Sequence, residues 1–186
     1  MRFFNTFFLA GAVLLCSCTS SGRFAPPSED KIIMQNEALQ AFNAASKCEE
    51  KKDYRAAISY YEKSMEYDVL YESAYYKTGR CYALLKEWKK AEEIFLDILR
   101  SDSENTSIKD SLGYVYFNSG RTEQAEELYG TLTRENPFNA ELSYKYIKTL
   151  IQNGKKDEAC HEFEKFKVEF PRNKVEIKKL TELLSD

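Results

Sequence analysis

Apolar residues recur every three or four positions from Ser28 to Leu184, and this spacing predicts a succession of amphipathic helices. Ser28 is followed by Glu29 and Asp30, which is the pattern of a helix N-cap with acidic residues in the first turn. We therefore expect the first helix to begin there. Glycine and proline are scarce, with seven and four residues, which argues against a turn-rich β fold. The predicted fold class is all-α.

The helical region contains an internal repeat. Four alanines are spaced 34 residues apart, and each is followed four positions later by an aromatic residue. The alanines are Ala57, Ala91, Ala125 and Ala159, and the aromatic residues are Tyr61, Phe95, Tyr129 and Phe163. A fixed period of this length indicates a stack of similar units.

This period resembles the tetratricopeptide repeat, a helix-turn-helix unit of 34 residues. The resemblance places four copies at residues 38–71, 72–105, 106–139 and 140–173. The two middle copies carry most of the motif, as Thr78-Gly79…Tyr82…Trp88…Ala91…Phe95 and Leu112-Gly113…Tyr116…Ala125…Tyr129…Pro137. The resemblance implies an α-solenoid in which Gly79 and Gly113 face the alanines of their own repeats, so that the two helices of each repeat approach closely.

Each repeat is expected to contain a tight turn between its two helices. Gly120 and Gly154 occupy this turn in the third and fourth copies, where a positive φ is often needed. Lys52-Asp53 and Lys86-Glu87 stand at the same place in the first two copies, so we expect these lysines to take that conformation without glycine.

Residues 173–184 predict one more amphipathic helix after the fourth repeat. Its apolar residues Ile177, Leu180 and Leu184 share one face. We expect this helix to cap the open end of the solenoid. Alternatively, the exposed side of this helix forms a surface that binds a partner or a second copy of the chain.

The N-terminal segment differs from the repeats. Met1-Arg2 precedes an apolar run that ends at Leu15. At ~1.5 Å per residue this run is about 20 Å long, too short for a bilayer core of ~30 Å. Residues 1–17 are therefore predicted to be a signal peptide. Residues 18–27 are polar, end in two prolines and predict a flexible tether, and 28–186 form the solenoid.

The junction resembles the lipobox of bacterial lipoproteins, because Leu15 lies three residues before Cys18 and Ser17 directly before it. The resemblance implies that Cys18 is lipidated and becomes the first residue, with Cys16 as the alternative cysteine. Ordinary secretion with a free Cys18 also stays open. Thr19 in place of aspartate favours the outer membrane, by similarity to the enterobacterial sorting rule. The expected location is the bacterial cell envelope, facing the periplasm.

Charge and composition narrow the chemistry. The chain has 27 basic and 30 acidic residues, a net charge of −3, which disfavours nucleic acid as a partner. Its one histidine, His161, adjoins Cys160, and adjacent helical residues diverge too far to chelate a metal. Glu49-Glu50, Glu92-Glu93 and Glu126-Glu127 are adjacent pairs on helices and are expected to lie in solvent. We therefore expect no catalytic residue, no metal site and no cofactor.

Three cysteines follow the N-terminal segment, at positions 48, 81 and 160. They fit as small apolar residues near buried helix faces. A Cys48–Cys81 disulfide between neighbouring first helices is the alternative, and it requires Cα atoms within ~7 Å.

The repeat family lines its concave groove with the first helix of each unit. In this chain those positions carry a row of aromatic residues beside basic ones, and such residues anchor interfaces. The resemblance thus implies a partner-binding groove made of Phe42, Tyr76, Lys77, Arg80, Tyr114, Phe117, Tyr144, Lys145 and Lys148. Phe42 and Ser46 replace residues of the family's carboxylate clamp, which disfavours a receptor for chaperone tails. A peptide with apolar and acidic side chains would suit this groove.

The expected function is a lipid-anchored scaffold or adaptor that binds an envelope protein or peptide in the groove. An auxiliary ligand-binding lipoprotein of a solute transporter is the alternative, and a closed pocket in place of an open trough would favour it. An enzyme is not expected, because no titratable groups converge in the sequence pattern.

Overall fold

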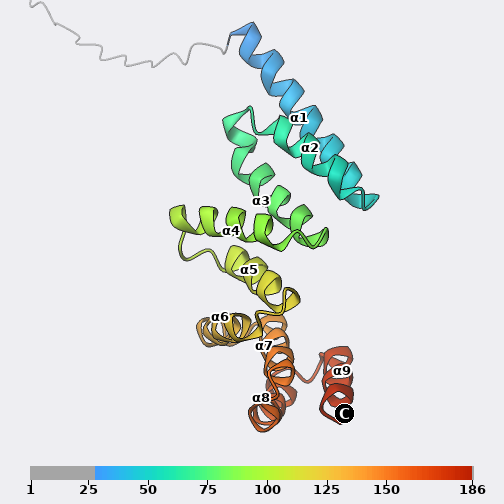
Figure 1. The fold of residues 1–186 in the computed structure, drawn as a ribbon, viewed down its shortest axis with the longest axis vertical. Coiled ribbons are helices and arrows are strands. Elements are labelled where there is room, and N and C mark those ends of the chain that lie inside the picture. The colour runs from blue at the N-terminus through green and yellow to red at the C-terminus, as the bar shows by residue number, and fades with distance from the viewer. Residues whose placement is uncertain (1–27, 186) are drawn as a thin grey trace, which may run out of the picture.

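A computed structural model describes residues 28–185 of the chain, and this part contains nine helices and no strand. The helices follow one another in antiparallel pairs that stack into an elongated, open solenoid (Figure 1). They are α1 Glu29–Glu50, α2 Tyr54–Ser64, α3 Asp68–Leu84, α4 Trp88–Ser101, α5 Thr106–Asn118, α6 Thr122–Glu135, α7 Ala140–Gln152, α8 Lys156–Glu169 and α9 Lys174–Ser185. The predicted fold class is confirmed.

The expected signal peptide, the tether and the candidate lipidation residues Cys16 and Cys18 lie outside the described residues. Between residues 28 and 185, no helix has the length and apolar character that crossing a membrane requires.

Side-chain caps start four of the helices. Ser28 accepts a hydrogen bond from the backbone of Lys31 at 3.4 Å, so α1 begins where the sequence predicts. Asp53, Asn105 and Asn139 cap α2, α5 and α7 in the same way. Each cap satisfies backbone N–H groups that would otherwise lack a partner in the first turn.

The first helices of the repeats differ in length. α5 and α7 begin at 106 and 140, the first residues of the expected third and fourth repeats. α3 begins four residues before 72, and α1 begins nine residues before 38. The early part of α1 is exposed and includes Ile32, Ile33 and Met34, so it projects from the end of the solenoid (Figure 1).

A side chain on either glycine of the middle repeats would strike an aromatic ring of the same repeat. A Cβ atom at Gly79 would lie 2.8 Å from Cε1 of Phe95, and one at Gly113 would lie 2.7 Å from Cζ of Tyr129. The alanine four residues earlier is also buried in each repeat. The missing side chain therefore makes room for the ring of the same repeat, and no larger residue fits there without displacing it.

The turns behave as the sequence predicts. Gly120 and Gly154 have φ values of 83° and 74°, and Lys52 and Lys86 have 61° and 60°. A lysine in this left-handed region is strained, because its Cβ crowds the backbone.

Replacing Lys86 with glycine should therefore raise the free energy of unfolding by up to about 1 kcal/mol, since glycine removes that strain at a smaller entropic cost. Denaturant unfolding followed by circular dichroism measures the change. Glu93→Gly, at an exposed position in the middle of α4, is the control and should lower stability by about 1 kcal/mol. A Lys86→Gly protein less stable than wild type would contradict the account.

Helix α9 covers the C-terminal end of the solenoid. Leu180 is fully buried against α7 and α8, and Ile177 and Leu184 are half-buried in the same cluster. The helix thus takes the place that the first helix of another repeat would occupy, which is the capping arrangement. Its other side exposes Val175 and Leu183.

Candidate partner-binding groove

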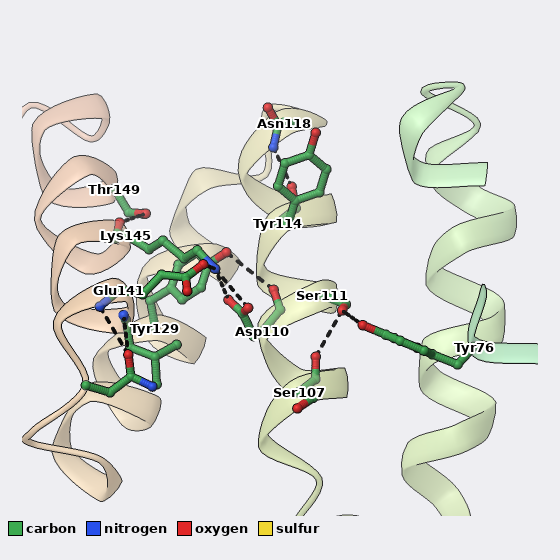
Figure 2. A network of polar contacts seen from close by, with 12 residues as sticks. Tyr76, Ser107, Asp110, Ser111, Tyr114, Asn118, Tyr129, Glu141, Lys145 and Thr149 are labelled. Atoms are coloured by element: carbon green, nitrogen blue, oxygen red, sulfur yellow. Dashed lines mark hydrogen bonds and ion pairs between the residues drawn. The ribbon is translucent and has the colours of Figure 1, made fainter. Parts of the chain in front are cut away.

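The four first helices, α1, α3, α5 and α7, are joined in sequence by polar contacts between their side chains. Lys77 of α3 donates to Glu49 of α1 at 3.1 Å. The Tyr76 hydroxyl lies 3.4 Å from Ser111 Oγ of α5, and Lys145 of α7 donates to Asp110 at 2.8 Å (Figure 2). These contacts place the expected groove residues of α3, α5 and α7 along a common surface.

Two cavities adjoin on this surface, one on each side of α5. The first, of about 290 Å³, lies between α3 and α5, and the second, of about 220 Å³, lies between α5 and α7. Tyr114 and Lys145 line both cavities. The expected residues that line at least one of them are Tyr76, Arg80, Tyr114, Phe117, Tyr144, Lys145 and Lys148.

Phe42 and Lys77 line neither of these two cavities. Phe42 is half-buried, with its ring edge-on to Tyr61 at 5.2 Å between centroids. Lys77 points to Glu49. The structure therefore places both residues in the packing between α1, α2 and α3.

Glu49 is the acceptor of a partly buried polar cluster. Its carboxylate binds Lys77 Nζ at 3.1 Å, the Arg80 guanidinium at 3.5 Å and the Tyr61 hydroxyl at 2.8 Å. Burial alone would raise the pKa of Glu49, but the hydrogen bonds from Tyr61 and Lys77 and the charges of Lys77 and Arg80 hold this pKa below its usual value. Both cations are thus partly neutralised within the chain.

Because folding lowers the pKa of Glu49, its carboxylate stabilises the fold above the unfolded pKa of about 4.5, and this contribution is lost as the pH falls through the folded pKa. Glu49→Gln should therefore be less stable than wild type at neutral pH, with a difference that shrinks in acid. Urea unfolding at several pH values measures it. Glu50→Gln, at an exposed position, is the control. A difference independent of pH would contradict this reading.

Lys145 is also paired. Its ammonium lies 2.8 Å from Asp110 and 2.7 Å from Glu141, so its donors are all used (Figure 2). Burial would lower the pKa of Lys145, but the bonds to these two carboxylates raise it. Lys145 therefore acts as a wall of both cavities and not as a free positive charge.

Lys148 differs from the other basic residues of the groove. Its ammonium lies 5.1 Å from the ring centre of Phe117 and 5.7 Å from that of Tyr144. Among the groove lysines and arginines that the structure describes, it is the one with no carboxylate within 4.0 Å. Its positive charge is therefore available to a ligand.

The two central tyrosines have different environments. Tyr76 is half-buried, with its ring 6.1 Å from that of Phe95. Tyr114 is 41% exposed and contacts Trp88 edge-on at 6.5 Å. Tyr76 therefore contributes to folding as well as to the groove, whereas Tyr114 is a large ring presented to solvent.

A third cavity, of about 470 Å³, lies beside the first, near the N-terminal ends of α3 and α5. The rings of Tyr71 and Tyr75 stack at 5.5 Å on this side, and the Tyr75 hydroxyl donates to Asp97 at 3.2 Å. Glu72 and Asp102 also line it. This end of the surface is acidic.

Several charged contacts were not predicted from the sequence. Glu92 binds Arg121 at 2.8 Å and Glu126 binds Lys155 at 2.6 Å, each joining one repeat to the turn of the next. The expectation that these two glutamates lie in solvent is wrong, and it is also wrong for Glu49, which is paired with Lys77 and Arg80. The sequence does contain a signal for these ion pairs: Glu92 and Glu126 are 34 residues apart, and Arg121 and Lys155 are separated by the same interval.

The three cysteines differ in burial, because Cys81 is buried and Cys48 half-buried, but Cys160 is exposed and not near a buried face as expected. Cys48, Cys81 and Cys160 are all free, so the alternative Cys48–Cys81 disulfide is not formed. Burial, with the nearby charge of Glu49, raises the pKa of the Cys81 thiol to about 11. In residues 28–185 no three His, Cys, Asp or Glu side chains gather in a way that could hold a metal ion.

These features define an α-solenoid with an open, mixed-charge groove. A family model described as tetratricopeptide repeat matches residues 50–106 and 111–173, which is more than half of the chain. The chain belongs to the tetratricopeptide repeat family. No curated protein matches it.

Several solved structures share the fold. YrrB, described as a TPR protein with an unusual peptide-binding site, is 24% identical with a TM-score of 0.59, over 82% of this chain and 79% of that one. MamA from Desulfovibrio magneticus RS-1 is 14% identical with a TM-score of 0.65, over 82% and 93%. A tetratricopeptide repeat protein from Parabacteroides merdae is 19% identical with a TM-score of 0.60, over 80% and 71%.

Proposed function

We propose that this protein is a lipid-anchored adaptor of the bacterial cell envelope, and that its groove binds a segment of another envelope protein. The observation that carries the proposal is the pair of adjoining cavities on either side of α5, with the exposed ring of Tyr114 between them. Exposed aromatic rings beside apolar pockets are typical of the central contacts of protein interfaces.

The size of the two cavities favours side chains over a whole small molecule. At about 290 and 220 Å³ they lie below the range of ~300–1,000 Å³ usual for small-ligand sites. Such cavities suit single side chains of a longer segment, whereas the third cavity, of about 470 Å³, lies within the range of small-ligand sites. The proposed role is non-catalytic, because the carboxylates of the groove are already paired with cations.

The anchor part of the proposal rests on the sequence around Cys18. A diacylated cysteine holds a protein firmly on a membrane, whereas a single acyl chain binds reversibly. Ten residues, 18–27, join this cysteine to α1, and a chain of that length spans at most ~35 Å. The solenoid would therefore stay near the membrane, on the periplasmic side of the outer membrane if Thr19 directs sorting.

Cys18→Ala should move the full-length protein from the membrane fraction to the soluble fraction of the envelope, because the lipid would have no attachment site. Fractionation followed by immunoblotting measures the distribution. Cys16→Ala is the matched control and should stay with the membranes. If Cys18→Ala remains bound while Cys16→Ala is released, Cys16 is the lipidated residue. If neither is released, lipid anchoring is wrong.

A further inference from the structure

We infer that the cavity between α5 and α7 receives an acidic side chain of the bound segment, which pairs with Lys148 while neighbouring apolar side chains fill the two cavities. The inference rests on the proposed function, since it names the ligand of the same groove. It starts from a charge that the fold leaves uncompensated.

The first step is the charge balance of the groove. Lys77 and Arg80 share Glu49, and the ammonium of Lys145 is held by Asp110 and Glu141. Lys148 has aromatic rings around its ammonium but no carboxylate. A carboxylate on the open side of this ammonium would complete an ion pair next to apolar surface, where such pairs are stronger than in bulk water.

The second step is the source of the carboxylate. A chain-terminal carboxylate buried here would need several donors, since its two oxygens have about four lone-pair positions. The neighbouring ammonium of Lys145 already binds two carboxylates, which leaves the hydroxyls of Tyr114 and Tyr144 and one N–H of Asn118 as neutral donors beside Lys148. An Asp or Glu side chain accepts the same number of hydrogen bonds, but it reaches the ammonium from a segment that can continue on both sides along the open groove. We therefore assign an internal acidic side chain.

The third step is the spacing of the apolar side chains. The two cavities lie on either side of α5, so the width of one helix, about 10 Å, separates them. A polyproline-like segment rises ~3.1 Å per residue and returns to the same face every third residue, which gives about 9 Å. A β-strand places the third residue on the opposite face. The spacing therefore fits apolar residues three positions apart in a polyproline-like segment.

The polarity of the ligand follows from the third cavity. Glu72 and Asp102 line that cavity, where Asp97 is already paired with Arg100 at 2.7 Å, while Lys148 lies beside the α5–α7 cavity. An acidic side chain is repelled at the first end and attracted at the second. The bound segment should therefore carry its acidic residue beside the apolar side chain in the α5–α7 cavity, and neutral or basic residues at the other end.

The test uses a labelled peptide with C-terminal amide that contains Lys-Leu-Pro-Pro-Leu-Glu, and a twin in which Gln replaces Glu. Fluorescence anisotropy with the wild-type protein should show the Glu peptide binding about tenfold more tightly, or about 1.4 kcal/mol. Lys148→Met should abolish the difference, and Lys148→Arg should keep most of it. Lys63→Met, on α2 outside the groove, should leave the tenfold preference unchanged.

Other outcomes are also decisive. Equal binding of the two peptides to the wild-type protein, or a preference that persists in Lys148→Met, would overturn the inference. The proposed groove function would still stand in either case if Tyr114→Ala weakens the binding of both peptides. Tighter binding of the Gln peptide once its C-terminus is a free acid would show that a terminal carboxylate is the ligand. Failure of every peptide to bind would reject this ligand class, whereas capture of envelope proteins tests the proposed function separately.

Discussion

Replacing Gly79 with alanine should lower the free energy of unfolding by about 1–2 kcal/mol, although alanine is normally the better helix residue. The new Cβ would lie 2.8 Å from both Ile94 Cγ2 and Phe95 Cε1, inside van der Waals contact. Overpacking of a filled core costs about 1–3 kcal/mol, and the gain of about 1 kcal/mol from helix propensity offsets only part of it. Thermal and urea unfolding measure the change.

A smaller side chain at position 95 supplies the control. Phe95→Leu removes the ring that the alanine would strike, so Gly79→Ala should cost less in that background than in wild type. A double-mutant cycle of the four proteins isolates this coupling. Equal costs in both backgrounds would show that the glycine is not required by the ring.

Tyr114→Ala combined with Lys148→Glu should reduce binding of the groove ligand at least 100-fold while leaving the melting temperature nearly unchanged. Truncating a central interface aromatic commonly costs 2 kcal/mol or more, and the second change reverses the available charge. Tyr114 is 41% exposed, and Lys148 has no carboxylate partner among the residues described, so the two changes remove only the edge contact with Trp88 and the ring contacts of the Lys148 ammonium. Retention of envelope proteins on the immobilised variant measures the effect.

The matched control is Tyr60→Ala with Lys63→Glu on α2. Tyr60 is 43% exposed, so the pair alters ring area and charge by the same amount outside the groove. This variant should retain its partner. Loss of capture in both variants, or in neither, would argue against a binding site at α5 and α7.

Local regularities of the sequence were enough to predict the fold. The 34-residue interval of the alanines and aromatic residues predicts paired helices, and the Ser28 cap predicts the start of α1, because both depend on neighbours along the chain. The early start of α3 and the contact between Gly79 and Phe95 could not be predicted. They depend on how far each helix is displaced against the next.

The groove was predictable in outline only. The repeat position of Tyr114 and Lys148 indicates the surface on which they lie. The pairing of Lys145 with Asp110 spans 35 residues, and that of Lys77 with Glu49 spans 28, so both require the relative placement of neighbouring repeats. The sequence therefore predicts four cations in the groove. In the structure three of them are paired with carboxylates, and Lys148 is not.

Site-specific photo-crosslinking in living cells tests the central claim, that the groove is the partner-binding surface, most directly. A photoreactive phenylalanine analogue would replace Tyr114 in one protein and Tyr60 in another, since the two side chains are similarly exposed. We expect a discrete crosslinked envelope protein from position 114, with little or none from position 60. Crosslinks of equal strength from both positions, or only from position 60, would contradict binding in the groove.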